Sequence, residues 1–376
     1  MRITFLGTHG QYNLGDELLL ETFLTQLGRE NRFAVNSYDP AFTQQSLRPR
    51  FDVEAFHTTR ELPRFMRYLL TGDLLFFGGG SIIKELYASV ERNRYATMGM
   101  ILATVTFTER IARKRVVMSN IGVGPPATPT GERLARWTLG QVDLLSVRDE
   151  QSRQTCLRLG LPSGRVRRVP DAVFANPPEV FLPQPVSAPP RDELHIALNL
   201  NYDIENRSAW EGFLTRLAEA LRLLDRERRL VVHALPMQSR FKAHDDLTEL
   251  KAFRERIPGI DMQLHDPQTA WEAAEIMAGC DLVLAERLHT LVVAAVLGLP
   301  FFGLVYDVKV RELVESLGMT EYSLNINAPF EALALFDGLK RLLEKRAAVR
   351  AGLLDCSRAL RQELAAYFSE LRNLLV

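Results

Sequence analysis

The chain has 376 residues, more than a single hydrophobic core normally serves, so we expect two domains. Lysine plus arginine and aspartate plus glutamate number 46 each, and this balance gives no indication of a nucleic-acid-binding protein. The three cysteines are far apart and form no CxxC pair, which argues against a disulfide scaffold or a zinc site and suits a reducing cytosol. Residues 1–7 are too short an apolar stretch for a signal peptide, and no apolar run reaches the length of a membrane span. We therefore expect a soluble, cytoplasmic protein, and peripheral contact with the inner face of a membrane stays open.

Short apolar runs alternate with helical stretches along the first part of the chain. Strands are predicted at residues 3–6, 74–77, 116–119 and 144–147, and an amphipathic helix at about 16–27. The run at 74–77 is continuously apolar and ends in three glycines, as expected for a parallel strand that is buried on both faces. This alternation predicts a parallel sheet with helices on both faces.

Six prolines interrupt the alternation: Pro177, Pro178, Pro183, Pro185, Pro189 and Pro190. Such density cannot continue a helix or a central strand, so we predict an extended linker over residues 177–192. It separates an N-terminal domain, residues 1–176, from a C-terminal domain, residues 193–345. A helical segment, residues 346–376, follows and is a candidate to cross back to the first domain.

The alternation of strands and helices resumes after the linker. The predicted strands are residues 195–200, 230–234, 262–264, 281–285 and 301–305, and the predicted helices are residues 209–224, 269–278, 288–297 and 310–317. The sequence thus predicts an α/β protein with two doubly wound, Rossmann-like domains that face each other across a cleft. Ligands in such folds bind at the carboxyl ends of the strands, so the informative residues are those in the loops that follow.

The loop after the first strand carries Asn13, Asp16 and Glu17. All three have structural explanations, since carboxylates favour the positive end of a helix dipole and an asparagine can cap a helix. The place of Asp16 at a ligand-binding edge also makes it a candidate base or a ligand of an acceptor hydroxyl. Both interpretations stay open at this point.

Glycines and an arginine follow other strands of the first domain. The triplet Gly78, Gly79 and Gly80 would let backbone N–H groups approach a ligand, or simply form a tight turn that needs positive φ. It matches neither the dinucleotide pattern GxGxxG nor the P-loop, so neither NAD nor ATP follows from it. Arg148, at the end of the strand 144–147, is as compatible with an ion pair as with a ligand.

The strongest indication of chemistry lies between residues 281 and 310. Arg287 and His289 stand at the start of a predicted apolar helix, where unpaired N–H groups and the helix dipole favour an anion. Arginine adds a planar fork for phosphate or carboxylate, and histidine can transfer a proton near neutral pH. Lys309 follows the next strand and adds a further cation. The alternative is an ion pair between Arg287 and Glu286, or a carboxylate of the other domain.

Other polar residues give weaker indications. His233 and His265 lie near strand ends, where satisfied histidines are more common than catalysts. Residues 236–238 and 244–246 are candidates for a loop at the ligand-binding edge. The basic run 110–115 is typical of a solvated helix end, with attraction to anionic lipid as the lesser alternative.

Together these motifs resemble the polysaccharide pyruvyl transferase family, which includes enzymes that pyruvylate cell-wall-linked sugars. The matching features are Asn13-x-Gly15-Asp16-Glu17, Gly78–Gly80, Gly122-x-Gly124-Pro125, Val147-Arg148-Asp149 with Ser152, Pro170-Asp171-x-x-Phe174, Arg287-x-His289 and Tyr306-Asp307-x-Lys309-Val310. Each is weak alone, but their order and spacing are fairly specific. Two positions depart from the family pattern: Val308 replaces a common proline and Lys84 a common acidic residue, which concerns the acceptor more than the donor.

The resemblance implies a fold like that of the two-domain GT-B glycosyltransferases, phosphoenolpyruvate as donor, no metal and no further cofactor. It implies transfer of pyruvate to two hydroxyls of a sugar, in an exopolysaccharide or cell-wall polysaccharide or its nucleotide- or lipid-linked precursor, with a ketal as product and release of phosphate. By analogy Arg148, Arg287 and His289 would bind the donor, with His289 as general acid and Asp16 as base. Acceptor binding would fall to Asn13, Glu17, Gly79, Gly80, Asp307 and Lys309.

Two other functions stay open. The same fold and the Arg287-x-His289 motif could serve a glycosyltransferase that uses a nucleotide sugar. A catalytically silent relative with a binding role is the second alternative, and the presence of Asp16, Arg148 and Lys309 beside that motif argues against it. No nucleic acid partner is expected.

Overall fold

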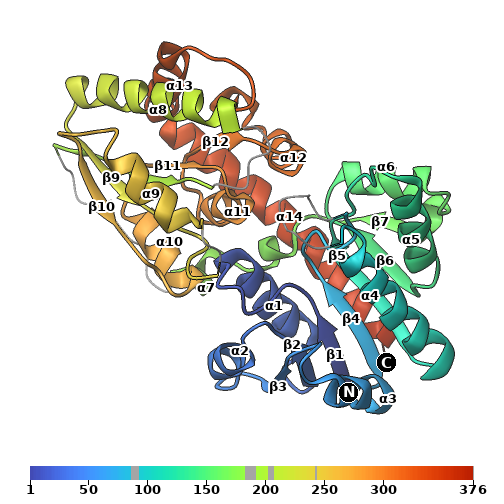
Figure 1. The fold of residues 1–376 in the computed structure, drawn as a ribbon. Coiled ribbons are helices and arrows are strands. Elements are labelled where there is room, and N and C mark those ends of the chain that lie inside the picture. Colours follow the sequence, from blue (N-terminus) through green and yellow to red (C-terminus); the bar gives the residue numbers. More distant parts are fainter. Residues whose placement is uncertain (86–92, 183–191, 202–206, 242–243, 376) are drawn as a thin grey trace. The chain divides into compact units, whose positions relative to one another are not determined.

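The computed structural model describes residues 1–85, 93–182, 192–201, 207–241 and 244–375. The chain divides into two compact units, each built on one parallel sheet (Figure 1). The first unit comprises Met1–Gln11, Asp16–Ala172 and Glu363–Val376, and the second comprises Tyr12–Gly15 and Val173–Gln362. Each unit is therefore built mainly from one part of the chain and completed by a short segment from elsewhere.

The first unit has a seven-stranded parallel sheet in the order β3-β2-β1-β4-β5-β6-β7. Its strands are β1 (Arg2–Leu6), β2 (Arg32–Asn36), β3 (Asp52–Phe56), β4 (Leu74–Gly78), β5 (Arg115–Ile121), β6 (Leu144–Val147) and β7 (Val166–Arg168). The chain adds strands on one side of β1 and then, from β4 on, on the other side. The carboxyl ends of β1 and β4 therefore form a topological switch point, the place where doubly wound sheets bind ligands.

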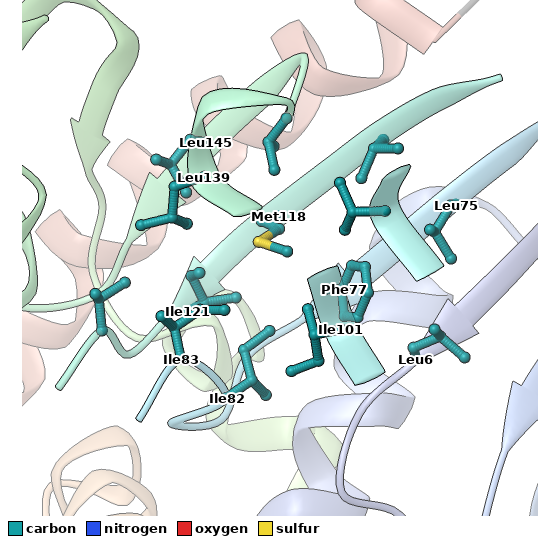
Figure 2. Packing of buried hydrophobic residues seen from close by; sticks show 14 of the residues in the cluster. Leu6, Leu75, Phe77, Ile82, Ile83, Ile101, Met118, Ile121, Leu139 and Leu145 are labelled. Carbon is teal, nitrogen blue, oxygen red and sulfur yellow. The ribbon is translucent and has the colours of Figure 1, made fainter. Parts of the chain in front are cut away.

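Helices surround this sheet. They are α1 (Leu14–Leu27), α2 (Pro40–Leu47), α3 (Leu62–Thr71), α4 (Ala96–Thr106) with a π-helical turn after it (Phe107–Ile111), α5 (Pro129–Gly140) and α6 (Glu150–Arg158). One buried apolar cluster joins the sheet to α3, α4, α5 and α6. It includes Phe77 of β4, Met118 of β5, Ile101 of α4 and Leu139 of α5 (Figure 2).

A second apolar layer contains α1 and the end of the chain. Neighbouring residues of a strand point to opposite faces, so Phe76 of β4 points away from the cluster that holds Phe77. The Phe76 ring centroid lies 5.3 Å from that of Phe5 and 5.6 Å from that of Phe23. Phe368, near the end of the chain, lies 5.8 Å from Phe23. The sheet is therefore buried on both faces, as its continuously apolar strands predict.

The second unit has a six-stranded parallel sheet in the order β10-β9-β8-β11-β12-β13. Its strands are β8 (Leu194–Asn199), β9 (Leu230–Ala234), β10 (Asp261–Leu264), β11 (Leu282–Ala285), β12 (Phe301–Val305) and β13 (Ser323–Asn325). The remaining helices are α7 (Pro178–Phe181), α8 (Arg207–Glu227), α9 (Asp246–Arg254), α10 (Ala270–Ala278), α11 (Leu288–Leu297), α12 (Val308–Ser316), α13 (Ala332–Glu344) and α14 (Arg346–Leu375). The switch point of this sheet lies between β8 and β11.

Helix α11 is buried along its whole length, which fits its almost wholly apolar sequence. It ends at Gly298, whose φ is +65°. A Cβ atom at this position would lie 2.6 Å from Cγ of Leu354 in α14. Both the left-handed backbone and the close approach of α14 therefore require glycine.

The terminal helix α14 contributes to both units, since its residues from Glu363 onward belong to the first one. There the hydroxyl of Tyr367 lies 2.7 Å from the hydroxyl of Ser119 in β5 and 2.7 Å from that of Ser146 in β6. The expected return of the terminal helix to the first domain is thus confirmed. None of the described helices is long and apolar enough to cross a membrane.

The predicted strands and helices are confirmed with their ends within three residues, but several elements were not predicted. β2 and β3 lie on the outer side of the first sheet, and their charged residues mask the apolar pattern. The predicted linker falls largely on residues 183–191, outside the described part. Before it, Pro177 and Pro178 begin the one-turn helix α7 rather than extended chain, because proline is well tolerated at the first helical position.

Candidate functional site

The carboxyl ends of β8 and β11 bring together the strongest candidates of the second unit. Asn199 ends β8, and its Nδ2 donates to the carbonyl of Leu235 at 2.9 Å. Its Oδ1 accepts from the backbone N–H of Arg287 at 3.0 Å. Asn199 thus ties the loop after β11 to the loop after β9, at the switch point of this sheet.

Asp246, the first residue of α9, holds the guanidinium of Arg287 in place. Its carboxylate is fully buried and accepts from Arg287 Nη2 at 2.6 Å and from Nε at 3.2 Å. It also accepts from the backbone N–H groups of Met237 and Gln238 at 3.0 and 3.2 Å. Gln238 Oε1 in turn accepts from Arg287 Nη2 at 3.1 Å. The side chain of Arg287, 14% exposed, is therefore a fixed cation with a carboxylate partner.

Glu286 lies beside this ion pair but does not form it. Its side chain is fully buried. Burial raises the pKa of Glu286 well above its ordinary value, and the charge of Asp246 raises it further, while Arg287 lowers it. Burial thus favours the neutral carboxylic acid at this position.

His289 stands on the first turn of α11 beside the segment 12–15. A Cβ atom at position 15 would collide with the imidazole ring, so only Gly15 fits against it without movement. The backbone N–H of Leu14 donates to the carbonyl of Met237 at 2.9 Å, which fixes the segment to the loop after β9. The imidazole of His289 is therefore oriented by close packing against the first turn of α1.

Asn13 has the capping role that the sequence left open. Its Oδ1 accepts from the backbone N–H of Gly15 at 3.0 Å, and its backbone pairs with Gln238 in an isolated antiparallel bridge. Two motifs far apart in the chain, Asn13-x-Gly15 and Arg287-x-His289, thus meet in the second unit.

Asp307 and Lys309 follow β12, the neighbour of β11. Asp307 caps α12 and accepts from the backbone N–H of Lys309 at 3.2 Å. The Lys309 ammonium lies 3.5 Å from Asp307 Oδ2 and 5.4 Å from the ring centroid of Tyr306. The cation expected after this strand is present at the carboxyl edge, partly balanced by the helix cap.

Arg148 follows β6 in the first unit and is held more loosely than Arg287. Its Nη2 donates to Ser81 Oγ at 3.0 Å. Carboxylate oxygens of Asp149 and Asp171 lie 3.7 and 3.8 Å from its guanidinium, beyond hydrogen-bond distance. Asp149 also caps α6 by accepting from the N–H of Ser152 at 2.7 Å. Arg148 is only 7% exposed, so its charge is sheltered from water.

Gly79 and Gly80 form the turn that carries Ser81 to Arg148. Their φ angles are +65° and +72°, in the left-handed region that favours glycine. The N–H of Gly79 donates to the carbonyl of Ser119 at 2.9 Å, and the carbonyl of Gly80 accepts from the N–H of Gly122 at 2.7 Å. A tight turn with positive φ therefore accounts for both glycines.

The loop after β1 supplies hydrogen bonds to Asp16 and Glu17. Thr8 Oγ1 donates to Asp16 Oδ2 at 3.1 Å, and the N–H of Gly10 donates to Glu17 Oε1 at 2.6 Å. Burial raises the pKa of Glu17 to about 8; the Gly10 N–H lowers it and the charge of Asp16 raises it. Glu17 can therefore gain or lose a proton near neutral pH.

His9 lies in the same loop and does not appear among the sequence candidates. Its ring is buried, and neither ring nitrogen has a hydrogen-bond partner among the described residues. Burial lowers the pKa of His9 to about 3, so the ring is neutral. A Cβ atom at Gly7 would collide with this ring. Only its place after the first strand could have indicated His9 from sequence.

Asp246 is the residue whose role the sequence analysis missed. In the sequence, Asp246 belongs only to a candidate ligand-binding loop after the strand 230–234, and no local pattern links it to Arg287. Within the described residues, no group of three or more His, Cys, Asp or Glu side chains is placed to hold a metal ion. The two units thus offer cations at the carboxyl ends of their strands, Arg148 in one and Arg287 with Lys309 in the other.

The family model of polysaccharide pyruvyl transferases matches residues 13–308, most of the chain. The chain belongs to this family. The resemblance drawn from the motifs is confirmed, and the matched region contains Arg148, Arg287 and His289. No curated protein matches the chain significantly.

Solved structures similar to this member of the pyruvyl transferase family show the fold. The Anabaena protein HepE in complex with UDP has 14% sequence identity and a TM-score of 0.64, over 99% of this chain and 98% of that one. UDP-GlcNAc 2-epimerase from Neisseria meningitidis bound to UDP-GlcNAc has 12% identity and a TM-score of 0.59, over 97% and 99%. A UDP-N-acetylglucosamine 2-epimerase from Listeria monocytogenes has 12% identity and a TM-score of 0.60, over 94% and 90%. The expected two-domain α/β fold of the GT-B type is confirmed.

Proposed function

We propose that this pyruvyl transferase moves pyruvate from phosphoenolpyruvate to two hydroxyls of a sugar, with formation of a ketal and release of phosphate. The observation that carries the proposal is the start of α11. Arg287 and His289 stand there at the positive end of a buried helix, one fixed by Asp246 and the other packed against Gly15. Such an arrangement suits a multiply charged donor whose charge changes during the reaction.

The chemistry of ketal formation assigns a task to each group. A proton must reach the methylene carbon of phosphoenolpyruvate, and the oxocarbenium-like centre that results is attacked by one sugar hydroxyl. A second hydroxyl then displaces phosphate and closes the ring. We assign His289 as the general acid and Asp16 as the base for an acceptor hydroxyl, a contribution of about 10²–10⁴-fold in such reactions. Arg287 in the second unit and Arg148 in the first are each a proposed ligand for the phosphate or the carboxylate of the donor.

The acceptor in this proposal is a sugar bound to a nucleotide. Support comes from the similar structures, since HepE is described in complexes with UDP and with UDP-glucose. Asn13, Glu17, Gly79, Gly80, Asp307 and Lys309 are the proposed acceptor residues. Lys309 is the cation among them, and phosphate groups are its natural partners. The reaction requires no metal and no cofactor beyond the donor, and we place it in the cytoplasm.

A glycosyltransferase that uses a nucleotide sugar as donor is the second candidate. The same complexes with UDP and UDP-glucose favour it, because the fold is shared. In that case the α11 start would bind a diphosphate instead of phosphoenolpyruvate, and no phosphate would leave the donor.

Release of inorganic phosphate from phosphoenolpyruvate distinguishes the candidates. The purified chain is assayed with UDP-sugars and with lipid-linked sugars, beside Arg287→Ala and His289→Ala. Arg358→Ala is the control, since its side chain is 61% exposed on α14 and is not among the candidate site residues. Acceptor-dependent release that both site variants lose, and the control keeps, supports the proposal. If the protein turns over a UDP-sugar and does not use phosphoenolpyruvate, the glycosyltransferase function replaces the proposed one.

A further inference from the structure

Exposed apolar side chains lie at the amino ends of three neighbouring strands of the first unit. Leu70, at the end of α3, leads into β4; Ile111, after α4, leads into β5; Trp137, in the last turns of α5, leads into β6 (Figure 1). β4 pairs with β5 and β5 with β6, all parallel, so their amino ends share one edge of the sheet. The three residues are 51%, 67% and 61% exposed, an unusual set for large apolar side chains.

Basic residues surround these side chains. From β1 across to β7, the same edge carries Arg2, Arg67, Arg110, Arg113, Lys114, Arg115 and Arg165, against Asp73, Glu109 and Asp143. We call these residues, with Leu70, Ile111 and Trp137, the amino-edge patch. Basic residues outnumber acidic ones in it by seven to three, although the two kinds balance over the whole chain.

The acidic residues of the amino-edge patch already have partners. Asp73 accepts from the backbone N–H of Arg2 at 2.8 Å, and Asp143 accepts from that of Val116 at 2.7 Å. Glu109 lies 3.4 Å from its neighbour Arg110. With these acidic residues counted, seven basic residues stand against three acidic ones, so the net charge of the amino-edge patch is positive.

We infer that the amino-edge patch docks the protein on an anionic lipid surface. Exposed tryptophan and isoleucine suit the boundary between headgroups and acyl chains, and arginine and lysine can extend around them to lipid phosphates. The carboxyl ends of the same strands lie at the opposite edge of this sheet, so docking leaves the loops around Arg148 accessible. This inference does not rest on the proposed function.

Sedimentation with lipid vesicles tests the inference on the full chain. Vesicles of phosphatidylcholine alone are compared with vesicles of equal parts phosphatidylcholine and phosphatidylglycerol, at low and high salt. We expect binding to the anionic vesicles alone, and its loss at high salt. The double variant Ile111→Ser with Trp137→Ser should bind at least tenfold more weakly.

A charge variant and a matched control complete the experiment. Arg113→Asn with Lys114→Gln removes two charges and should weaken binding roughly 25-fold; asparagine tolerates the positive φ of Arg113. Leu62→Ser is the control, because Leu62 is 53% exposed on the same helix as Leu70 but at its other end. The inference is overturned if the wild-type protein stays in the supernatant. It is also overturned if Leu62→Ser and the apolar double variant lose vesicle binding equally. A protein that binds a single-stranded oligonucleotide but not vesicles would likewise contradict it. A dimer in sedimentation velocity that Trp137→Ser dissociates would instead make this edge an interface between copies of the chain.

Discussion

Two partly buried arginines, one in each unit, are held in different ways. Arg287 donates two charge-assisted hydrogen bonds to the fully buried Asp246, the shorter at 2.6 Å. Arg148 donates to the hydroxyl of Ser81, its carboxylate neighbours stand 3.7 and 3.8 Å away, and its Nε has no hydrogen bond among the described residues. The first arginine is fixed in orientation, whereas the second keeps more of its capacity for another acceptor.

An arginine can attract an anion mainly through the fixed orientation of its guanidinium or mainly through its charge, and the two arginines differ in this respect. A guanidinium bound at two atoms by a carboxylate presents its remaining edge in one orientation, at the cost of part of its net charge. A guanidinium with distant carboxylates gives up less of its attraction for an anion, because Coulomb energy falls with distance. We therefore expect Arg287 to depend on its fork shape and Arg148 mainly on its charge.

Lysine substitution separates the two roles and has the largest expected effect. Arg287→Lys keeps the charge but loses the fork on which Asp246 acts, so kcat/KM for phosphate release should fall about 10³-fold. Arg148→Lys should lose only about tenfold, while Arg148→Ala should lose about 10³-fold. The measurement is steady-state phosphate release. Equal losses in the two lysine variants would remove the distinction between the arginines.

Asp246→Asn tests the same difference by changing the partner of Arg287 and leaving the arginine in place. The variant leaves Arg287 without a charged partner in a buried site, so the free energy of unfolding should fall by about 3–5 kcal/mol. Activity should fall about 10–100-fold through KM for the donor, because the arginine is present but no longer oriented. Denaturant unfolding and donor titration give the two quantities.

Glu286→Gln is the matched control for Asp246→Asn. Its carboxyl group is expected to be neutral already, so the amide should change the free energy of unfolding by less than about 1 kcal/mol at pH 6. A loss as large as that of Asp246→Asn would show that Glu286 is charged in the folded protein.

The sequence predicts which residues lie at the carboxyl ends of the strands, but it does not predict which side chains bind the arginines there. The apolar run 74–77 and the apolar helix 288–297 fix strands and helices because burial on all sides leaves no other pattern. The loops that follow them then place Arg148, Arg287 and His289 at carboxyl ends by topology alone. Asp246 stays hidden, since its contact with Arg287 joins two loops of one unit through the pairing of β9, β8 and β11. Long-range contacts of this kind leave no local spacing to detect.

Gly15→Ala tests the orientation of His289 with a smaller expected effect. The added methyl group collides with the imidazole, so the ring or the segment 12–15 must move, at a cost of about 1–3 kcal/mol. We expect kcat to fall about 10–100-fold with little change in KM, because donor binding by Arg287 is retained. Gly352→Ala is the control: this glycine lies in α14 with open space around it, and alanine should be neutral or slightly stabilising there. If Gly15→Ala has full activity, packing against Gly15 is not what orients His289 for the reaction.

Two titratable groups in the loop and helix that follow β1, Glu17 and His9, change stability with opposite signs as pH varies. The pKa of Glu17 is raised by burial from 4.5 to about 8, so the folded state binds the proton more tightly than the unfolded state does. Stability should therefore fall as pH rises from about 5 to 8. The pKa of His9 is lowered by burial from 6.5 to about 3, so its contribution is lost as pH falls through that interval. The two intervals overlap between pH 4.5 and 6.5, where the opposite slopes cancel, so the two groups together place the maximum of stability in that overlap.

Isosteric variants separate these contributions. Glu17→Gln keeps an oxygen for the Gly10 N–H and should flatten the decline between about pH 5 and 8, whereas His9→Gln should flatten the acid side alone. Denaturant unfolding at a series of pH values measures both. Glu286→Gln extends the comparison to the second unit, because its pKa is also raised and its loss of stability has the same sign as that of Glu17. If the Glu17→Gln profile superposes on that of wild type, Glu17 is ionised in the folded protein. Glu17 could then not supply a proton to its neighbour Asp16 near neutral pH.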